Sequence, residues 1–327
     1  MKKLITILKY LVLLIIFGII AFISYINWAL PNVGDPENIT VELTKESIER
    51  GKYLANSVCV CMDCHSVRDW NKFSGPLVEA TLGKGGEAFN QKLGFPGDFY
   101  AKNISPFALK SWTDGELLRA ISSGVGKNGK SLFPVMPYPN YGKMDRNDLY
   151  SIIAYLRSLD PVESLISESK ATFPMSLIIN TIPKKAQFSK IPDLNDTVAY
   201  GAYLFLAASC NDCHTKTKKG KPIKGMELAG GFEFPLITGG IVRSANITPD
   251  KETGIGNWTE DIFINRFKLY GDSAYIPNDI DKGNFNSTMP WMMYSGMKKE
   301  DLKAMFAYLK TIKPVKNDVI KFNPISR

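Results

Sequence analysis

The two histidines of this chain each close a C-x-x-C-H run, and this feature constrains the fold more than any other. The runs are Cys61–His65 and Cys210–His214, and the 327-residue sequence contains no other histidine. In such a run two thiols add to the vinyl groups of a porphyrin, and the adjacent imidazole binds its iron. The sequence therefore predicts two covalently attached haem c groups. The residues expected to hold them are Cys61, Cys64, His65, Cys210, Cys213 and His214.

Paired cysteines also occur in zinc sites and redox dithiols. A structural zinc site needs four Cys or His ligands at short spacing, and the two runs lie 149 positions apart. A thioredoxin-like dithiol needs no histidine and is expected within a βαβ pattern, which this sequence does not show. Covalent haem is therefore the interpretation we adopt. The fifth cysteine, Cys59, is either an alternative attachment partner of Cys64 or, as we favour, a small hydrophobic residue.

The N-terminus is strongly apolar. Lys2 and Lys3 precede an uncharged run from Tyr10 to Leu30. As a helix this run would be about 31 Å long, which matches the ~30 Å hydrocarbon core of a bilayer. Trp28 lies where an interfacial aromatic belongs, and the lysines mark the cytoplasmic end. Because no good cleavage site follows, residues 1–32 are predicted to be a retained transmembrane anchor rather than a cleaved signal, with the remainder in the bacterial periplasm.

The two C-x-x-C-H runs belong to an internal repeat. Each follows a helix-like segment and precedes a long loop with an Asn-Ile-Ser/Thr-Pro motif. A methionine loop comes next, and then a final segment, 148–159 or 301–312, with apolar residues at helical spacing. Gly51 and Gly201 are expected where the first and last helices of each repeat cross, since a missing Cβ allows close approach. The predicted fold class is therefore all-α.

The repeat sets the predicted domain boundaries. After the anchor come a first domain at 40–160, a linker at 161–195 and a second domain at 196–318. The loops within each domain are longer than compact domains normally contain, and the faces of a haem would replace the missing core. The linker carries an apolar stretch, 173–182, that is too short to span a membrane. We expect this stretch to pack between the domains, with contact to the membrane surface as the alternative.

The second axial ligand of each iron cannot be histidine, because both histidines are already used. Methionine is the natural choice, since a soft thioether suits low-spin iron and raises its potential. Two methionine pairs recur in the repeat, Met136 with Met289 and Met144 with Met297. A residue before proline is pushed out of the helical region, which suits a ligand presented from a loop. We therefore expect Met136 and Met289 as the ligands and the second pair as packing residues.

A carbonyl of the Asn-Ile-Ser/Thr-Pro loop, 103–106 or 246–249, is expected to accept the free N–H of each ligating histidine. The net charge is +8, but no basic stripe with interleaved aromatics indicates nucleic acid binding. Five lysines between 216 and 224 follow the second haem motif. They are either a solvated loop or a patch that attracts an acidic partner.

Together these motifs resemble tandem class I cytochromes c. More narrowly, the chain is similar to the membrane-bound cytochrome c subunits of bacterial alcohol and gluconate dehydrogenases. The similarity lies in R-G-K-Y-L before C-M-D-C-H, in N-I-T-P-D-K-E-T-G-I-G-N-W at 246–258, and in M-P-Y-P-N-Y at Met136. It implies proximal ligation by His65 and His214, distal ligation by the methionines that precede proline, and a quinoprotein or flavoprotein dehydrogenase as electron donor. Those subunits typically carry three haems, whereas this sequence has two motifs.

The expected function is electron transfer without catalysis of a substrate reaction. A membrane-tethered two-haem carrier would accept electrons from a periplasmic donor, such as a dehydrogenase. It would pass them to a respiratory-chain acceptor, such as a terminal oxidase or another cytochrome. The alternative is a peroxidase-like two-haem enzyme, which would need an open iron face and a positioned acid or base. Histidine is not available for that role.

Overall fold

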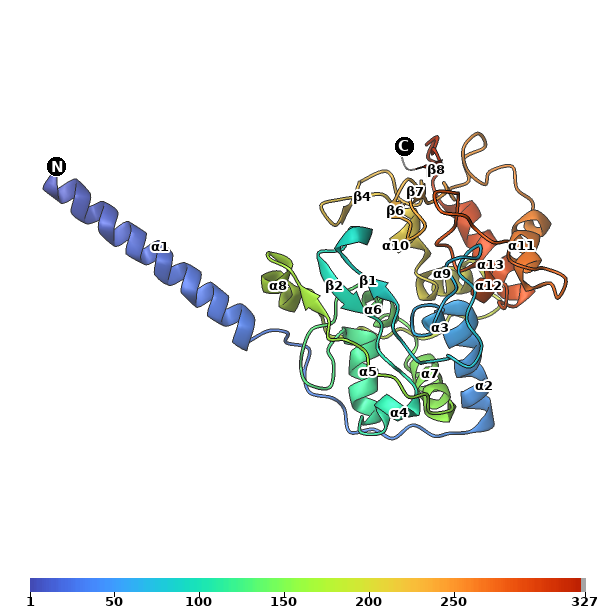
Figure 1. Cartoon of the computed structure of the whole chain (residues 1–327), viewed down its shortest axis with the longest axis horizontal. Helices are drawn as coiled ribbons and strands as arrows, with labels where there is room; N and C mark the ends of the chain where they lie inside the picture. Colours follow the sequence, from blue (N-terminus) through green and yellow to red (C-terminus); the bar gives the residue numbers. More distant parts are fainter. Residues whose placement is uncertain (325–327) are drawn as a thin grey trace.

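One long helix stands apart from the body of the molecule in the computed structural model, which describes residues 1–324 (Figure 1). Helix α1 (Lys2–Trp28) has a mean hydropathy of 2.7 over its most apolar 18 residues, and none of that window is buried. Its 27 residues rise about 40 Å, which is enough to cross the hydrocarbon core of a bilayer. The helix expected at 10–30 therefore exists, begins nearer the N-terminus and ends before Pro31.

The first half of the body is mainly helical. Two helices that are far apart in sequence, α2 and α7, pack along each other, and shorter elements surround them. The elements are α2 (Lys45–Tyr53), a π-helical turn (Leu54–Val58), α3 (Cys61–Cys64), β1 (Ala88–Phe89), a 3-10 turn (Gln91–Leu93), β2 (Gly97–Tyr100), α4 (Pro106–Leu109), α5 (Asp114–Ser123), α6 (Tyr138–Tyr141) and α7 (Arg146–Ser158).

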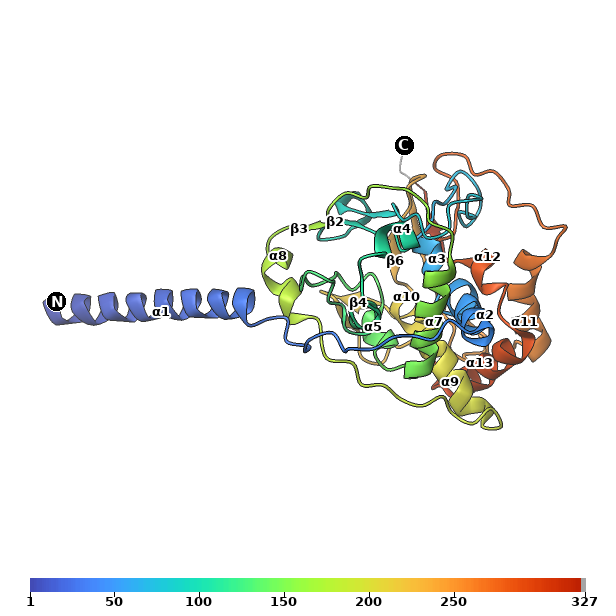
Figure 2. The ribbon, with the colours of Figure 1, turned by 90° about the horizontal axis from the view of Figure 1, so that it is seen from below.

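The second half repeats this order of helices, with α9 and α13 packed along each other. Both halves lie side by side in the body, at one end of α1 (Figure 2). The elements are α9 (Thr197–Ala207), α10 (Cys210–His214), β4 (Thr217–Lys218), β5 (Lys221–Pro222), β6 (Glu233–Pro235), β7 (Ile241–Arg243), α11 (Glu260–Lys268), a 3-10 turn (Leu269–Gly271), α12 (Trp291–Tyr294), α13 (Lys299–Thr311) and β8 (Phe322–Asn323).

A glycine marks the crossing point of the first and last helices in each half, as predicted. A Cβ on Gly51 would lie 1.7 Å from the carbonyl oxygen of Ser151 in α7, and one on Gly201 would lie 2.0 Å from that of Ala304 in α13. No other residue type permits such a backbone approach. The repeat therefore has a structural cause: the helix pair of each half packs closely only if glycine occupies this position.

The two halves differ by one residue between this glycine and the haem motif. The first half has ten positions from Gly51 to Cys61, and the second has nine from Gly201 to Cys210. The π-helical turn Leu54–Val58 accommodates the extra residue, because its wider turn holds one more residue than an α-helical turn. The C-x-x-C-H run thus begins at an equivalent place in both halves.

The predicted all-α class is too narrow, because the long loops pair locally into short strands. The structure contains antiparallel sheets ordered β1-β2-β3, β4-β5 and β6-β7-β8, where β3 is Lys170–Ala171, with strands of two to four residues. Extended loop segments that run past each other satisfy their backbone groups in this way. The core itself is helical and continuous through both halves.

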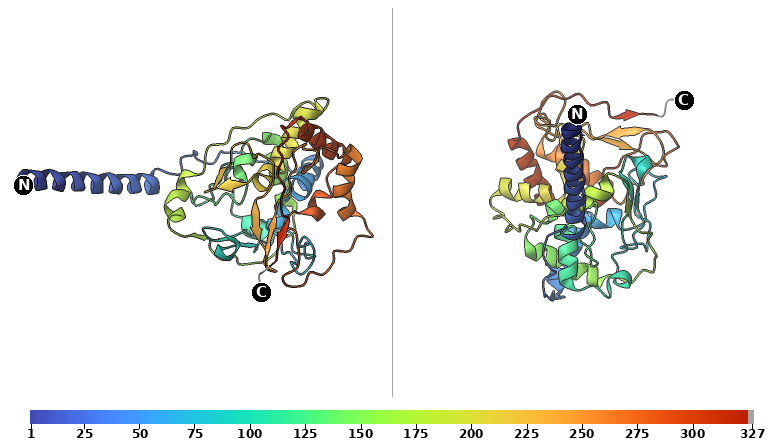
Figure 3. Two further views of the ribbon diagram at one scale, coloured as in Figure 1. Left: turned by 90° about the horizontal axis from the view of Figure 1, so that it is seen from above. Right: turned by 90° about the vertical axis from the view of Figure 1, so that its left-hand side faces the viewer.

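The segment 161–195 runs around the first half rather than between the halves, which corrects our expectation for it. It contains β3 (Lys170–Ala171), α8 (Met175–Ile178) and a 3-10 turn (Ile179–Thr181). β3 pairs with β2 of the first half, and Gln187 N–H donates to Gly142 O at 2.7 Å. α8 lies at the end of α1 (Figures 1 and 3). The edge of β2 offered free backbone groups, and the segment follows that edge.

Candidate functional site

Each C-x-x-C-H run forms a short helix whose start is held by a left-handed residue. Val60 precedes α3 with φ +45°, and Ser209 precedes α10 with φ +54°. A positive φ is unfavourable for a β-branched residue such as valine, so the surrounding contacts must hold it in place. In the first half Tyr141 O–H donates to Cys59 O at 3.0 Å, and in the second Tyr294 O–H donates to Ala208 O at 2.7 Å. A tyrosine of the methionine loop therefore fixes the entry to each motif.

Both histidines are oriented by the same hydrogen bond. His65 Nδ1 lies 2.7 Å from Lys102 O, and His214 Nδ1 lies 2.8 Å from Ala245 O. A carbonyl oxygen only accepts, so Nδ1 carries the proton and Nε2 is the bare nitrogen that binds a metal. Burial lowers the pKa of both imidazoles, which keeps them neutral. The carbonyls belong to the residues just before the two Asn-Ile-Ser/Thr-Pro loops, one position ahead of the predicted segments.

An identical network holds the carbonyl-bearing loop in each half. Asn103 Oδ1 accepts the N–H and the hydroxyl of Ser105, and Asn103 Nδ2 donates to Val162 O at 2.8 Å. In the second half Asn246 makes the same bonds with Thr248 and Val315. The asparagine thus ties the loop to the segment that follows the last helix. The sequence did not identify Val162 and Val315 as partners of the asparagines, because any residue type can supply a backbone carbonyl.

The surroundings of the cysteines differ from those typical of a zinc site or a redox dithiol. Burial raises the pKa of Cys61 to about 12, whereas a redox dithiol needs a lowered thiol pKa. No group of three or more His, Cys, Asp or Glu side chains able to hold a metal ion occurs within residues 1–324. Cys59 is buried, and its Sγ lies 3.9 Å from Met144 Sδ. It therefore packs in the core beside Met144, as a small hydrophobic residue does.

The two methionine pairs lie in different environments. Met144 and Met297 are fully buried among the helices. Met136 and Met289 are half-buried in the loops that precede α6 and α12, and each is followed directly by a proline. A side chain sealed in the helical core is not free to reach a metal, whereas the loop pair is. The full burial of Met144 and Met297 is that of packing residues, and ligation by Met136 and Met289 stays a prediction.

The two motifs lie close together because the halves exchange contacts across a pseudo-twofold interface. Tyr53 of the first half donates to Asp301 of the second, and Tyr203 of the second half donates to Asp148 of the first at 2.6 Å. Tyr200 also donates to Asp301, at 3.1 Å. Tyr53 and Tyr203 occupy equivalent positions of the repeat, as do Asp148 and Asp301, whereas the bond of Tyr200 lies within the second half. Polar residues repeated on otherwise apolar helix faces were the sequence signal that could have revealed this interface.

The loops beside the motifs also cross the interface. The π-helical turn of the first half packs against α12 of the second, and α9 of the second half packs against α6 of the first. Asn140 Nδ2, next to the first methionine loop, donates to Asp212 Oδ2 at 2.9 Å. Asp212 lies inside the second C-x-x-C-H run. Each half therefore contributes to the surroundings of the other half's site.

Comparison with known proteins bears on the same residues. Residues 198–313 match the family model described as Cytochrome c. This part of the chain is a cytochrome c domain. Such a domain binds haem covalently and transfers electrons, so haem binding and electron transfer follow for the chain. The His214 contact, the α9–α13 crossing and the Met289 loop all belong to this domain.

The relatives carry the resemblance through both halves. The cytochrome c subunit of a quinone-dependent alcohol dehydrogenase from Gluconacetobacter polyoxogenes is 25% identical over 285 residues, covering 82% of this chain and 56% of the relative. The gluconate 2-dehydrogenase cytochrome c subunit of Pantoea cypripedii is 27% identical over 280 residues, or 81% and 59%. A diheme cytochrome c-type protein of Cereibacter sphaeroides is 27% identical over 263 residues, or 77% and 81%. The predicted resemblance to dehydrogenase cytochrome c subunits is confirmed. The chain spans somewhat more than half the length of the dehydrogenase subunits it matches.

One feature of the first half has no counterpart in the matched cytochrome c domain. Arg68 donates to Asp63 Oδ2 at 2.7 Å, donates to the carbonyl oxygens of Ser74 and Gly75, and stacks on Trp70 with its guanidinium carbon 4.0 Å from the ring centroid. These contacts occupy all sides of the guanidinium, which is almost fully buried. They fold the loop after the first motif back onto the aspartate within that motif. The sequence contained no periodic signal for this arrangement.

Proposed function

We propose that the chain is a membrane-anchored two-haem electron carrier with cytochrome c domains at 40–160 and 196–318, joined by the segment 161–195. The observation that carries this proposal is the duplicated imidazole–carbonyl contact. His65 and His214 each present a bare Nε2 beside a pair of free thiols, with the same loop network behind them. A second half built in this way has the means to hold a second haem.

The donor set fits one haem c in each domain. Cys61 and Cys64 would bind the first porphyrin through thioethers, with His65 and Met136 as the axial ligands. Cys210, Cys213, His214 and Met289 would do the same in the second domain. When bound, each haem supplies a metal centre that changes by one electron. The protein fixes the imidazole through Nδ1 and carries the methionine on a separate loop, so both side chains would be available as ligands to the iron.

The proposed anchor is supported by α1, and the proposed partners by the relatives. We propose that α1 crosses the cytoplasmic membrane once and that both domains face the periplasm, where their lysine-rich surface is open to soluble and membrane-bound redox proteins. The named relatives are subunits of dehydrogenases, so a periplasmic dehydrogenase is the proposed donor. A respiratory-chain protein, such as a terminal oxidase or another cytochrome, is the proposed acceptor. Co-purification from detergent-solubilised membranes would identify both.

Haem content tests the two-domain proposal directly. Intact mass of the purified chain should exceed the polypeptide mass by two haems. Replacing Cys61 and Cys64 with alanine should leave one haem, and replacing Cys210 and Cys213 should leave the other. Cys59→Ala is the matched control and should retain both. A single haem in the unsubstituted chain, or loss of a haem in Cys59→Ala, would contradict the assignment.

Ligand binding separates a carrier from a peroxidase-like enzyme. Iron with both axial positions filled by imidazole and thioether should show a methionine–Fe(III) absorption band and should not bind carbon monoxide. An open iron face in either domain would appear as a high-spin ferric signal, carbon monoxide binding and turnover of peroxide. That outcome would replace the carrier proposal for the domain concerned.

The lysines after the second motif lie on the β4–β5 hairpin, where all five are exposed. We propose that this hairpin attracts an acidic redox partner. Charge attraction of this kind acts on the association rate and weakens with salt. Replacing Lys218 and Lys219 with glutamine should lower the rate of electron transfer at low salt and flatten its salt dependence. Replacing Lys45 and Lys52, which are exposed on α2, is the matched control.

A further inference from the structure

The apolar stretch 173–182 lies beside the end of α1, where the anchor joins the body (Figure 1). Asn180 Nδ2 donates to Ile26 O at 3.4 Å, and Asn180 Oδ1 accepts from Ser131 Oγ at 2.8 Å. Ile26 is 1% exposed, although most of α1 is open to its surroundings. α8 and the turn after it are therefore attached to the last turns of α1 and to the first half of the body.

The outer side of this stretch is apolar and uncovered. Phe173 is 81% exposed and Ile178 is 41% exposed. The ten residues from 173 to 182 carry no charge, whereas Lys170 lies just before them and Lys184 and Lys185 follow shortly after. A short apolar segment flanked by lysines is suited to the boundary between lipid headgroups and acyl chains.

The depth of the stretch relative to a bilayer follows from α1. The contact residue Ile26 lies between Tyr25 and Trp28, which are 58% and 89% exposed. Aromatic residues at the end of a transmembrane helix sit at headgroup level. Because α8 packs against the helix at this level, its exposed apolar side chains lie at the same depth.

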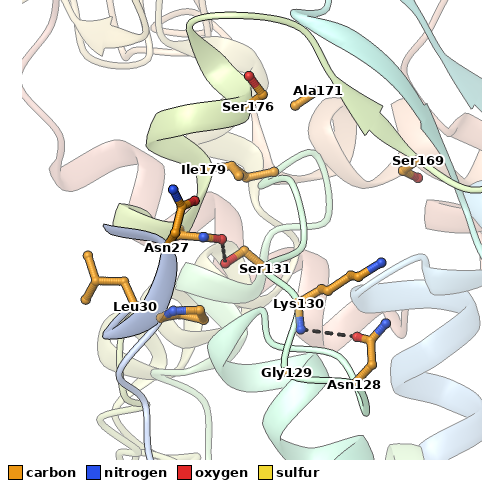
Figure 4. A pocket seen from close by; sticks show the side chains of 12 residues that line it. Asn27, Leu30, Asn128, Gly129, Lys130, Ser131, Ser169, Ala171, Ser176 and Ile179 are labelled. Atoms are coloured by element: carbon orange, nitrogen blue, oxygen red, sulfur yellow. Dashed lines mark hydrogen bonds between the residues drawn. The ribbon is translucent and has the colours of Figure 1, made fainter. Parts of the chain in front are cut away.

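A polar hollow beside α8 completes this face (Figure 4). It has a volume of about 340 Å³ and lies between the end of α1, the loop at 128–131 and the α8 segment. Its polar lining includes Asn27, Lys130 and Ser176. A bilayer surface has a polar headgroup layer above an apolar acyl layer. The polar hollow and the exposed apolar side chains of 173–182 match these two layers.

We infer that 173–182 is a second membrane contact, which docks the haem body on the outer surface of the bilayer beside its anchor. This inference rests on the proposed role of α1 as a membrane anchor. If α1 were the only membrane contact, the body could rotate about the extended segment that follows this helix. Two contacts fix which face of the body points to the membrane. The haem domains are then presented to their partners in one orientation.

Nitroxide labels test the inference on the full-length, haem-loaded chain in vesicles of phosphatidylcholine with a quarter phosphatidylglycerol. Single cysteines are introduced as Phe173→Cys and Ile178→Cys, with the unsubstituted chain as background. Ile276→Cys, an exposed apolar position in the loop after α11, is the matched control. Ile16→Cys reports on α1 itself. The visible spectrum of each variant verifies that it is folded.

Oxygen concentrates in the bilayer and a nickel chelate stays in water, so the ratio of their collision rates with the label reports depth. At 173 and 178 this ratio should be several-fold higher than at 276 and lower than or similar to that at 16. A high oxygen-to-nickel ratio at 16 together with a low ratio at 173 and 178 would overturn the second contact and leave the anchor intact. An aqueous signal at 16 would overturn both.

Discussion

The substitution Tyr203→Phe tests whether the reciprocal tyrosine–aspartate bonds hold the two halves together. Tyr203 is 5% exposed, and its hydroxyl donates to Asp148 Oδ2 at 2.6 Å. Asp148 also binds Arg50 through two bonds of 2.8 Å, so the carboxylate is not left unpaired when the hydroxyl is removed. The expected loss is that of one hydrogen bond to a charged group, about 1.5–3 kcal/mol, together with the longer bond of 3.2 Å that the hydroxyl accepts from Asp145 N–H.

Such a loss corresponds to a change of about 10- to 150-fold in an equilibrium constant. Urea unfolding of the haem-loaded chain in detergent, followed by circular dichroism, measures it as a fall in the free energy of unfolding. Tyr150→Phe is the matched control, because the half-buried Tyr150 accepts from Arg146 at 3.3 Å within the first half. If Tyr203→Phe costs no more than this control, the interface does not depend on the reciprocal bonds.

The same bond predicts a dependence on alkaline pH. Burial and the Asp148 charge raise the pKa of Tyr203 above its ordinary value of 10.0. A group with a raised folded-state pKa contributes its full stability below the unfolded value and loses it as the pH rises toward the folded value. The difference in stability between the unsubstituted chain and Tyr203→Phe should therefore shrink above pH 10. A constant difference up to the alkaline unfolding limit would refute the assignment of the bond.

Three further predictions follow from the repeat. Tyr53→Phe should cost about as much as its counterpart, about 1.5–3 kcal/mol in the same unfolding assay. Gly51→Ala should cost about 3 kcal/mol, because its Cβ would overlap a backbone carbonyl of α7; Gly126→Ala, with no neighbouring atom nearer than 3.5 Å, should cost less than about 1 kcal/mol. Met144→Ala should cost about 2–5 kcal/mol as a core truncation and keep the methionine–Fe(III) band, whereas Met136→Ala should weaken that band with a smaller loss of stability. The reverse pattern in the methionine variants would exchange the ligand assignment.

The proximal side of each haem site was largely predictable from the sequence. A C-x-x-C-H run places thiols and imidazole within five consecutive residues, so its chemistry depends on local spacing alone. The repeat then identified the glycines of the helix crossings and a carbonyl near residue 103 or 246 as the imidazole partner. The structure places that carbonyl one position earlier, at Lys102 and Ala245.

The distal side was predictable only as a choice between two methionine pairs. The proline after Met136 and Met289 favoured that pair as ligands and left Met144 and Met297 as packing residues, and the full burial of the second pair agrees with packing. The short strands were not predictable, because each consists of a few loop residues whose pairing depends on where the loop is held.

By itself, the sequence determined the haem motifs, the duplication and the apolar anchor, since each is a pattern within a short or regularly repeated stretch. Only the tertiary structure decided that Tyr53 meets Asp301 across 248 positions and that Tyr203 meets Asp148. It also decided that the segment 161–195 wraps the first half and brings α8 to the base of α1. These arrangements depend on how the two repeated units pack against each other. Contacts between units leave no periodic pattern in the sequence, so the sequence did not predict them.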